Sequence, residues 1–200
     1  MTYVWTTMHG HFRTDSKARA AAKEAFFGKR ISYREWFEHD LRLLRAAGAT
    51  REALVGLFRS IPLVPGAPET LAALRSAGAR IAVLSGSVDL LLHTVMPDER
   101  FDHVLINRLG FDADGHLSGG EATDYDVDRK ADGVRELCRR EGIAPERCAF
   151  VGDNENDLSA ASVAGFSIAF DCKSPKLAEA ASVAVPGGDL RAVLPYLIDP

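Results

Sequence analysis

The sequence lacks any uninterrupted apolar run near the roughly 18 residues that a transmembrane helix requires, although 46% of its 200 residues are hydrophobic. Its first residues, MTYVWTTMHGHFR, also lack the basic-then-apolar order of a secretory signal. We therefore expect no membrane span and a cytoplasmic location. A chain of this length and hydrophobicity can bury a sizeable core.

Cysteine and concentrated positive charge are scarce as well. The three cysteines, Cys138, Cys148 and Cys172, are far apart and odd in number, which argues against a disulfide framework or a zinc knuckle. The net charge is -4, and no basic stripe is present of the kind that neutralises a phosphate backbone. We expect neither a nucleic-acid nor a membrane partner, and the sequence fixes no oligomeric state.

The first third of the chain has a helical pattern throughout. Asp15 is placed to cap one helix, Ser32 and Glu35 have capping-box spacing ahead of a second, and a third follows Thr50. Amphipathic helices without an intervening strand are typical of a small helical lobe, so we predict a helical cap region over residues 1–62.

The pattern changes after residue 63, where short apolar runs alternate with helical stretches. The runs are RIAVLS, HVLIN, CAFVGD, FSIAF and SVAV. Runs with almost no polar interruption suit strands covered on both faces. We predict an α/β fold in which residues 63–200 form a three-layer, Rossmann-like core with a parallel sheet. The segment LGFDADGHLSG reads as a hairpin turned by Asp114-Gly115.

Three of these apolar runs end in polar residues, namely Ser85, Asp153 and Asp171. Ligands of open parallel sheets bind beyond the carboxyl ends of the strands. The sequence therefore predicts a site at this edge.

The segment FVGDNENDLSAA is the most informative one. Asp153 ends a strand, Asp157 lies four residues on, and Gly152 permits a sharp turn. Carboxylate and amide oxygens gathered at a strand end are the ligands that Mg²⁺ prefers. In the alternative interpretation, Asp153 and Asn154 form an Asx turn and Asp157 caps the next helix.

Two further motifs are weak in isolation. In VLSGS, the Ser85 hydroxyl and the amides that follow it, beginning with Gly86, can hold a phosphoryl oxygen at a helix start, but Ser85 or Ser87 can equally be a helix cap. Lys130 precedes a predicted helix, where most lysines are simply solvated. His9 and His11 can pair on a transition metal, although histidines on a frayed terminus more often bind nothing.

The three motifs are far more specific together, in this order along the chain, than any of them is alone. A serine at one strand end, then a lysine before a helix, then GDNEND at a later strand end resembles three of the four motifs of the haloacid dehalogenase phosphatases. The resemblance covers the chain from Val64 onward and is strongest to the phosphoserine phosphatases, with the preceding helices similar to their cap.

This resemblance implies a Mg²⁺-dependent phosphatase acting on a small phosphorylated metabolite. Ser85 and Gly86 would bind the phosphoryl group, and Lys130 would act in catalysis by neutralising charge. Asp153 would ligate Mg²⁺, and Asp157 would serve both the metal site and catalysis. The physical logic is that phosphoryl transfer needs mostly positioning and charge neutralisation.

The family's first motif, two aspartates two residues apart after the first strand, has no counterpart at the start of this chain, where Asp15 is the only acid before Glu24. We expect either a chain that lacks the beginning of its domain or a noncatalytic descendant that binds phosphate or a metabolite. For the 200 residues as printed, we expect little or no hydrolysis. The place of the substrate-binding cap arginine of phosphoserine phosphatases corresponds to Asp40, which favours a different small phosphomonoester.

Overall fold

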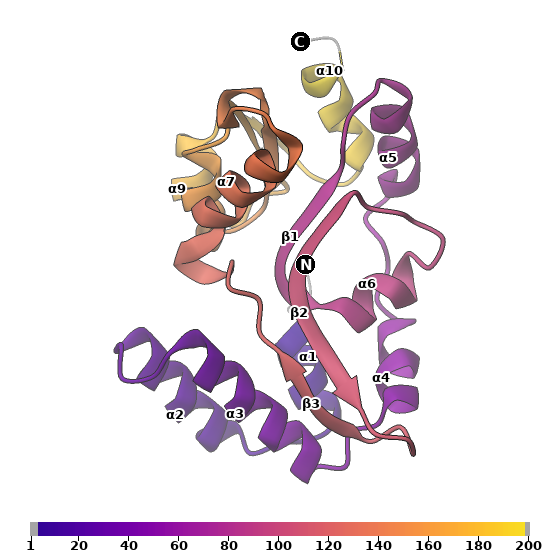
Figure 1. Cartoon of the computed structure of the whole chain (residues 1–200), viewed down its shortest axis with the longest axis vertical. Helices are drawn as coiled ribbons and strands as arrows, with labels where there is room; N and C mark the ends of the chain where they lie inside the picture. The colour runs from indigo at the N-terminus through magenta and orange to yellow at the C-terminus, as the bar shows by residue number, and fades with distance from the viewer. Residues whose placement is uncertain (1–3, 199–200) are drawn as a thin grey trace. The chain divides into compact units, whose positions relative to one another are not determined.

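The computed structural model describes residues 4–198, and it confirms the α/β class (Figure 1). The α-helices are α1 (Val4–His11), α2 (Ser16–Phe27), α3 (Tyr33–Ala46), α4 (Arg51–Phe58), α5 (Ala67–Ser76), α6 (Asp89–Val95), α7 (Lys130–Glu141), α8 (Leu158–Ala161), α9 (Pro175–Ala180) and α10 (Leu194–Leu197). The strands are β1 (Ala82–Val88), β2 (His103–Phe111), β3 (Leu117–Glu121), β4 (Ala149–Gly152), β5 (Phe166–Phe170) and β6 (Val183–Val185). Short 3₁₀ turns are η1 (Val127–Arg129), η2 (Pro145–Arg147), η3 (Glu155–Asp157) and η4 (Leu190–Val193).

The chain divides into two compact units. The first comprises residues 1–62, 87–99 and 106–123, and the second comprises residues 63–86, 100–105 and 124–200. One division falls at residue 62, and the assignment of residues 1–62 as a cap region stays a prediction. However, α6 and the β2–β3 hairpin group with the helices, because Val88, Leu90 and Leu109 are buried in the same hydrophobic cluster as α1, α3 and α4.

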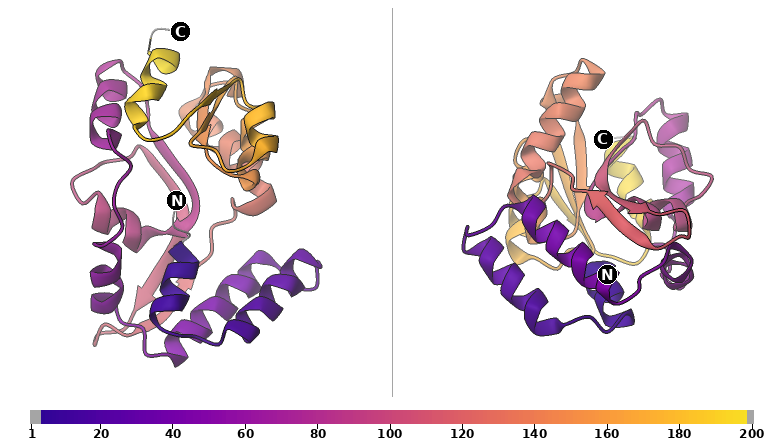
Figure 2. Two further views of the ribbon diagram at one scale, coloured as in Figure 1. Left: turned by 180° about the vertical axis from the view of Figure 1, so that it is seen from behind. Right: turned by 60° about the horizontal axis from the view of Figure 1, so that its bottom comes forward.

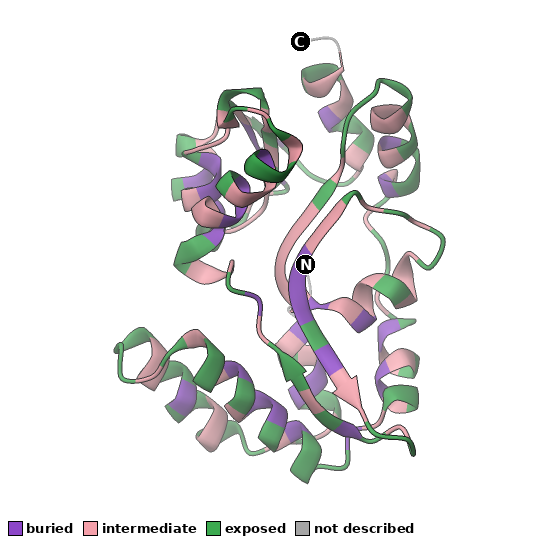
Figure 3. Cartoon of the chain, viewed as in Figure 1, coloured by how far each residue is buried: buried purple, intermediate pink, exposed green. Residues whose placement is uncertain are grey.

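The helical unit forms where the local sequence signals predict it. The Asp15 side chain accepts hydrogen bonds from the amides of the first turn of α2, the Ser32–Glu35 capping box opens α3, and the Thr50 hydroxyl caps α4. Helices α2 and α3 lie side by side in both views of Figure 2. Buried and exposed residues alternate along α3, as Figure 3 shows, which is the amphipathic pattern of a helix with one covered face.

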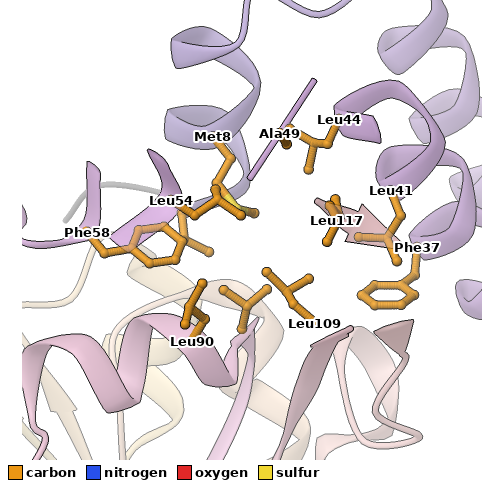
Figure 4. Packing of buried hydrophobic residues seen from close by; sticks show 12 residues of the cluster. Met8, Phe37, Leu41, Leu44, Ala49, Leu54, Phe58, Leu90, Leu109 and Leu117 are labelled. Carbon is orange, nitrogen blue, oxygen red and sulfur yellow. The ribbon is translucent and has the colours of Figure 1, made fainter. Parts of the chain in front are cut away.

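One hydrophobic cluster holds this unit together (Figure 4). Met8, Leu44, Leu54 and Phe58 are fully buried in it, and they come from α1, α3 and α4. Burying a side chain of this size contributes about 1.5–3 kcal/mol. The N-terminal segment is therefore anchored as the helix α1, whose Met8 side chain fills the centre of this core.

The predicted hairpin is confirmed. Strands β2 and β3 pair antiparallel, with Leu109 opposite Gly120. The Asp112 side chain accepts hydrogen bonds from the amides of Asp114 and His116 and so stabilises the turn.

In the second unit, β4, β5 and β6 form a parallel sheet in which Val151 lies opposite Ile168, and Ile168 opposite Val183. The predicted strands are all present, but they lie in two three-stranded sheets, with the orders β1-β2-β3 and β4-β5-β6. Within residues 4–198, no strand connects β1 to β4. The sequence between Val4 and Thr7 does not supply one, because it belongs to α1; Thr2 and Tyr3 lie outside the described residues.

No helix among the described residues is both long and apolar enough to cross a membrane.

Candidate active site

An ion pair between Lys130 and Asp157 forms the centre of the candidate site. The Lys130 Nζ atom lies 2.6 Å from Asp157 Oδ1, and only 8% and 5% of the two side chains are exposed. Lys130 is the first residue of α7, and Asp157 closes η3 after β4. The alternative that Lys130 is simply solvated is therefore wrong, because a partner carboxylate compensates for its burial.

Asp157 also fixes the loop that follows β4. Its Oδ2 atom accepts hydrogen bonds from the amides of Asp153, at 2.9 Å, and Asn154, at 3.2 Å. A Cβ atom at Gly152 would lie 2.7 Å from the same oxygen, so the close approach requires glycine. The Asn154 side chain caps η3 by accepting the Glu155 amide at 2.8 Å. The Asn154 side chain thus caps η3, whereas the expectation that Asp157 caps the next helix is wrong, because α8 has no side-chain cap and the Asp157 carboxylate instead accepts amides that precede it.

Asp153 follows β4 and is half-buried. Burial, followed by the neighbouring Asp157 carboxylate, raises the pKa of Asp153 above its ordinary value, while Lys130 and Lys173 act in the opposite direction. Because Lys130 is already bonded to Asp157, the Asp153 carboxylate has no cation of its own at hydrogen-bond distance among the described residues. A hard divalent cation with oxygen ligands fits this set of donors.

The two oxygens of Asp157 are engaged with Lys130 and the loop amides. This arrangement suits a residue that holds the site in shape, and its direct ligation of Mg²⁺ stays a prediction.

Ser85 lies inside β1 rather than at the end of the strand. The strand continues to Val88, which is itself the residue before α6, and no side chain caps that helix. The capping interpretation of Ser85 and Ser87 is therefore wrong. The strand runs on because Val88 is fully buried and the Ser87 carbonyl accepts a hydrogen bond from Asn107 at 3.0 Å.

The next residue, Gly86, contacts the side chain of Asp126, which none of the three motifs includes. A Cβ atom at Gly86 would lie 1.9 Å from Asp126 Oδ2. Asp126 precedes η1, four residues before Lys130, and η1 packs against η3. The only sequence signal for it is the run of alternating aspartates in TDYDVDRK. The segment Asp126–Lys130 thus links the Ser85-Gly86 motif to the Lys130–Asp157 pair.

Asp171 follows β5, the parallel neighbour of β4, as the sequence predicts. Its side chain is about half exposed and lies 3.8 Å from Lys173. The Lys173 amide in turn donates to the Asp153 carbonyl at 2.9 Å. Asp171 therefore contributes to the edge of the sheet, while its carboxylate faces solvent.

His9 and His11 differ in burial. His9 is buried in α1, where Nδ1 lies 2.7 Å from Thr14 Oγ1 and Nε2 lies 3.5 Å from Asp40 Oδ2. The expectation of a frayed terminus is wrong for this segment. His11 is exposed, so the two imidazoles do not share one environment.

Comparisons with known proteins agree with this geometry. Residues 9–165 match the family model of the haloacid dehalogenase-like hydrolases. The chain belongs to this family. A phosphoserine phosphatase of Methanocaldococcus jannaschii is 30% identical to it over 92% of this chain and 85% of that protein. A phosphoserine phosphatase of Archaeoglobus fulgidus is 34% identical over 72% of this chain, but the match spans only 41% of that protein.

A solved structure described as a phospho-aspartyl intermediate analogue of phosphoserine phosphatase superposes on this haloacid dehalogenase-like chain with a TM-score of 0.74. The identity is 29%, and the superposition covers 98% of this chain and 92% of the other. The chain is thus phosphoserine phosphatase-like in both sequence and fold.

Proposed function

We propose that this chain carries the Mg²⁺ and phosphoryl site of a phosphatase that acts on a small phosphomonoester. The observation that carries the proposal is the buried Lys130–Asp157 pair, at 2.6 Å, beside the half-buried Asp153 carboxylate. A structural ion pair alone does not need a third carboxylate whose pKa is raised by burial and by its acidic neighbour.

The proposal gives each of these residues a role. Asp153 would ligate Mg²⁺, and Asp157 would keep both the Asp153 amide and the lysine in place. Lys130 would neutralise charge on a phosphoryl oxygen, while Ser85 and Gly86 would bind that group through a hydroxyl and an amide. When bound, Mg²⁺ supplies electrostatic stabilisation of the phosphoryl oxygens.

The substrate would be a phosphomonoester other than phosphoserine. Asp40 lies in α3 and is buried beside His9 and Arg19, at 3.5 Å and 3.8 Å. By the resemblance to the phosphoserine phosphatases, Asp40 stands where their cap arginine holds the substrate, and a carboxylate there would repel the carboxylate of an amino-acid phosphate.

For the 200 residues as printed, we propose very slow turnover. Phosphatases of this class work through an aspartyl-phosphate intermediate, and the segment from Val4 to Thr14, ahead of α2, consists of α1 and a short turn and contains no acidic residue. A second candidate function follows from the same observation, namely a protein that binds phosphate or a phosphorylated metabolite without hydrolysing it.

Calorimetry with Mg²⁺ and inorganic phosphate, together with a phosphate-release assay on a panel of small phosphomonoesters, tests these proposals. We expect saturable, Mg²⁺-dependent phosphate binding that Asp153→Asn abolishes. The matched control is Asp171→Asn, which alters an exposed aspartate after the neighbouring strand and should leave binding unchanged.

Phosphate release that depends on Mg²⁺ and is lost in Asp153→Asn would refute slow turnover while supporting the phosphatase site. Binding without release favours the second candidate. If neither Mg²⁺ nor phosphate binds, the proposed site is wrong.

A further inference from the structure

Asp126 has a carboxylate oxygen that finds no hydrogen-bond partner in the part of the chain that the structure describes. Its Oδ1 atom is buried and accepts no hydrogen bond from residues 4–198. Leaving a buried acceptor unsatisfied is unfavourable, because the group has lost its water and gained no donor in return. Such a group at a candidate ligand site indicates that a ligand supplies the missing donor.

The position of this carboxylate is narrowly defined. Its three terminal atoms lie 1.9 to 2.6 Å from where a Cβ atom on Gly86 would stand, so the group rests directly on that glycine. The residue after it, Val127, has φ +53°, a left-handed conformation that is strained for a β-branched side chain. Strain of this kind persists where the surrounding structure holds a functional group in place.

Charge alone would exclude phosphate from this position. A carboxylate and a fully deprotonated oxyanion repel each other where water is excluded. The repulsion becomes attraction when the oxyanion carries a proton, because an O–H group donating to a carboxylate makes a short, charge-assisted hydrogen bond. Inorganic phosphate keeps a P–OH group at neutral pH, whereas sulfate, of the same shape, has none.

We propose that Asp126 is a specificity-determining residue, which accepts a hydrogen bond from a P–OH group of the ligand held at Ser85-Gly86. The inference rests on the proposed phosphoryl site and deepens it. The carboxylate selects protonated oxyanions and rejects those that have only acceptors.

A consequence for substrates follows directly. A phosphomonoester loses its last proton with a pKa of about 6, so its dianion presents no donor at neutral pH. The inorganic phosphate released by hydrolysis still does. Asp126 therefore favours released phosphate, or the monoanionic ester, over the dianionic ester.

The test is calorimetry of the whole chain with Mg²⁺, titrated with sodium phosphate and, separately, with sodium sulfate at matched ionic strength. We expect phosphate to bind at least about tenfold more tightly than sulfate, the effect of one hydrogen bond to a charged group. In Asp126→Asn an NH₂ donor replaces one of the two acceptor oxygens and the negative charge is lost, so sulfate should gain affinity, phosphate should lose its charge-assisted bond, and the ratio should fall toward one.

Asp128→Asn is the matched control. It removes the same charge two residues further along, from an exposed side chain, and should preserve the ratio. Asp126→Ala provides a second variant, since it removes the acceptor without adding a donor and should reduce the ratio through weaker phosphate binding.

The outcomes test the specificity role of Asp126 separately from the phosphoryl site itself. If wild-type protein binds phosphate and sulfate equally, or if neither Asp126 variant changes the ratio, the specificity role is overturned while the phosphoryl site stands. If both Asp126→Asn and Asp128→Asn strengthen the two anions alike, the effect is net charge and the specificity role is again overturned. If wild-type protein binds neither anion, the proposed function fails together with the inference.

Discussion

Lys130 Nζ lies 2.6 Å from Asp157 Oδ1, and this buried contact joins the first residue of α7 to the loop after β4. Neither charge is near enough to water to be stabilised without the other. The pair therefore holds together two segments that are 27 residues apart and that carry most of the candidate site.

Removing either partner of this pair should strongly destabilise the protein. We expect Lys130→Ala and Asp157→Ala each to lower the free energy of unfolding by about 3–5 kcal/mol, because each leaves a buried charge unpaired. The double variant should lose less than the sum of the two, since it leaves no orphaned charge. Urea unfolding of the four proteins measures the coupling.

The exposed pair of Lys176 and Glu155 is the matched control. Its Nζ–Oε1 distance is 2.5 Å, but 70% and 59% of the two side chains are exposed, so Lys176→Ala should change the free energy of unfolding by no more than about 1 kcal/mol. Equal effects of Lys130→Ala and Lys176→Ala would show that burial of the Lys130–Asp157 pair is not maintained in solution.

Gly86→Ala should destabilise the protein through a single contact. The new Cβ atom would overlap the Asp126 carboxylate, which is only 1.9 Å away, and the strained Val127 backbone limits how far the carboxylate can retreat. We expect a loss of about 1–3 kcal/mol, the usual range for overpacking, measured by thermal or urea unfolding.

The same substitution in an Asp126→Ala background should be nearly neutral, since the overlapping atoms are gone. Gly56→Ala is the comparison: nothing lies within 4 Å of a Cβ atom there, and Gly56 is an exposed position of α4. That variant should gain about 0.5–1 kcal/mol. A Gly86→Ala loss that persists without the Asp126 carboxylate would contradict the proposed contact.

His9→Ala should cost about 1–3 kcal/mol of stability, whereas His11→Ala should stay within about 0.5 kcal/mol. The difference arises because His9 is buried between Thr14 and Asp40 and its loss leaves the Asp40 carboxylate with fewer compensating contacts. Chemical unfolding of the two variants side by side checks this. Comparable effects would mean that the two histidines share one environment after all.

The sequence predicted those features that depend on local chemistry. The helix caps at Asp15 and Ser32 and the hairpin turn at Asp114-Gly115 involve residues within a few positions of one another. The apolar runs likewise predicted every strand of the β4-β5-β6 sheet. In each case the interacting groups are neighbours in the chain, so their spacing alone was enough.

The features that the sequence did not predict depend on contacts between distant segments. The contact of Asp126 with Gly86 joins residues 40 positions apart, and the burial of His9 requires Asp40 on another helix. Ser85 also lies inside β1 rather than at its end, because Val88 and the Ser87 carbonyl find partners further along the chain. Apart from the alternating aspartates around Asp126, the residues next to these positions give no signal of such contacts.

The acid stability of the protein should depend in part on Glu136 in α7. Its carboxylate accepts hydrogen bonds from Arg139, at 2.8 and 2.9 Å, and from Arg140, at 2.8 Å. The hydrogen bonds from Arg139 make the largest contribution, and the bond from Arg140 the next largest, to lowering the pKa of Glu136 to about 2. A carboxyl group whose pKa is lower in the folded than in the unfolded chain stabilises the fold above its unfolded pKa, and this contribution is lost as the pH falls toward the folded value.

We therefore expect Glu136→Gln to lower the melting temperature at pH 7 and to have a shrinking effect as the pH falls from about 4.3 to about 2. Because the two arginines are largely exposed to solvent, 1 M salt should also reduce the difference at pH 7, where the screening length falls to about 3 Å. Glu179→Gln, at an exposed position of α9, should show neither dependence. Melting curves across pH and salt measure both trends, and a Glu136→Gln effect that stays constant from pH 7 to pH 2 would contradict the ion-pair origin of the lowered pKa.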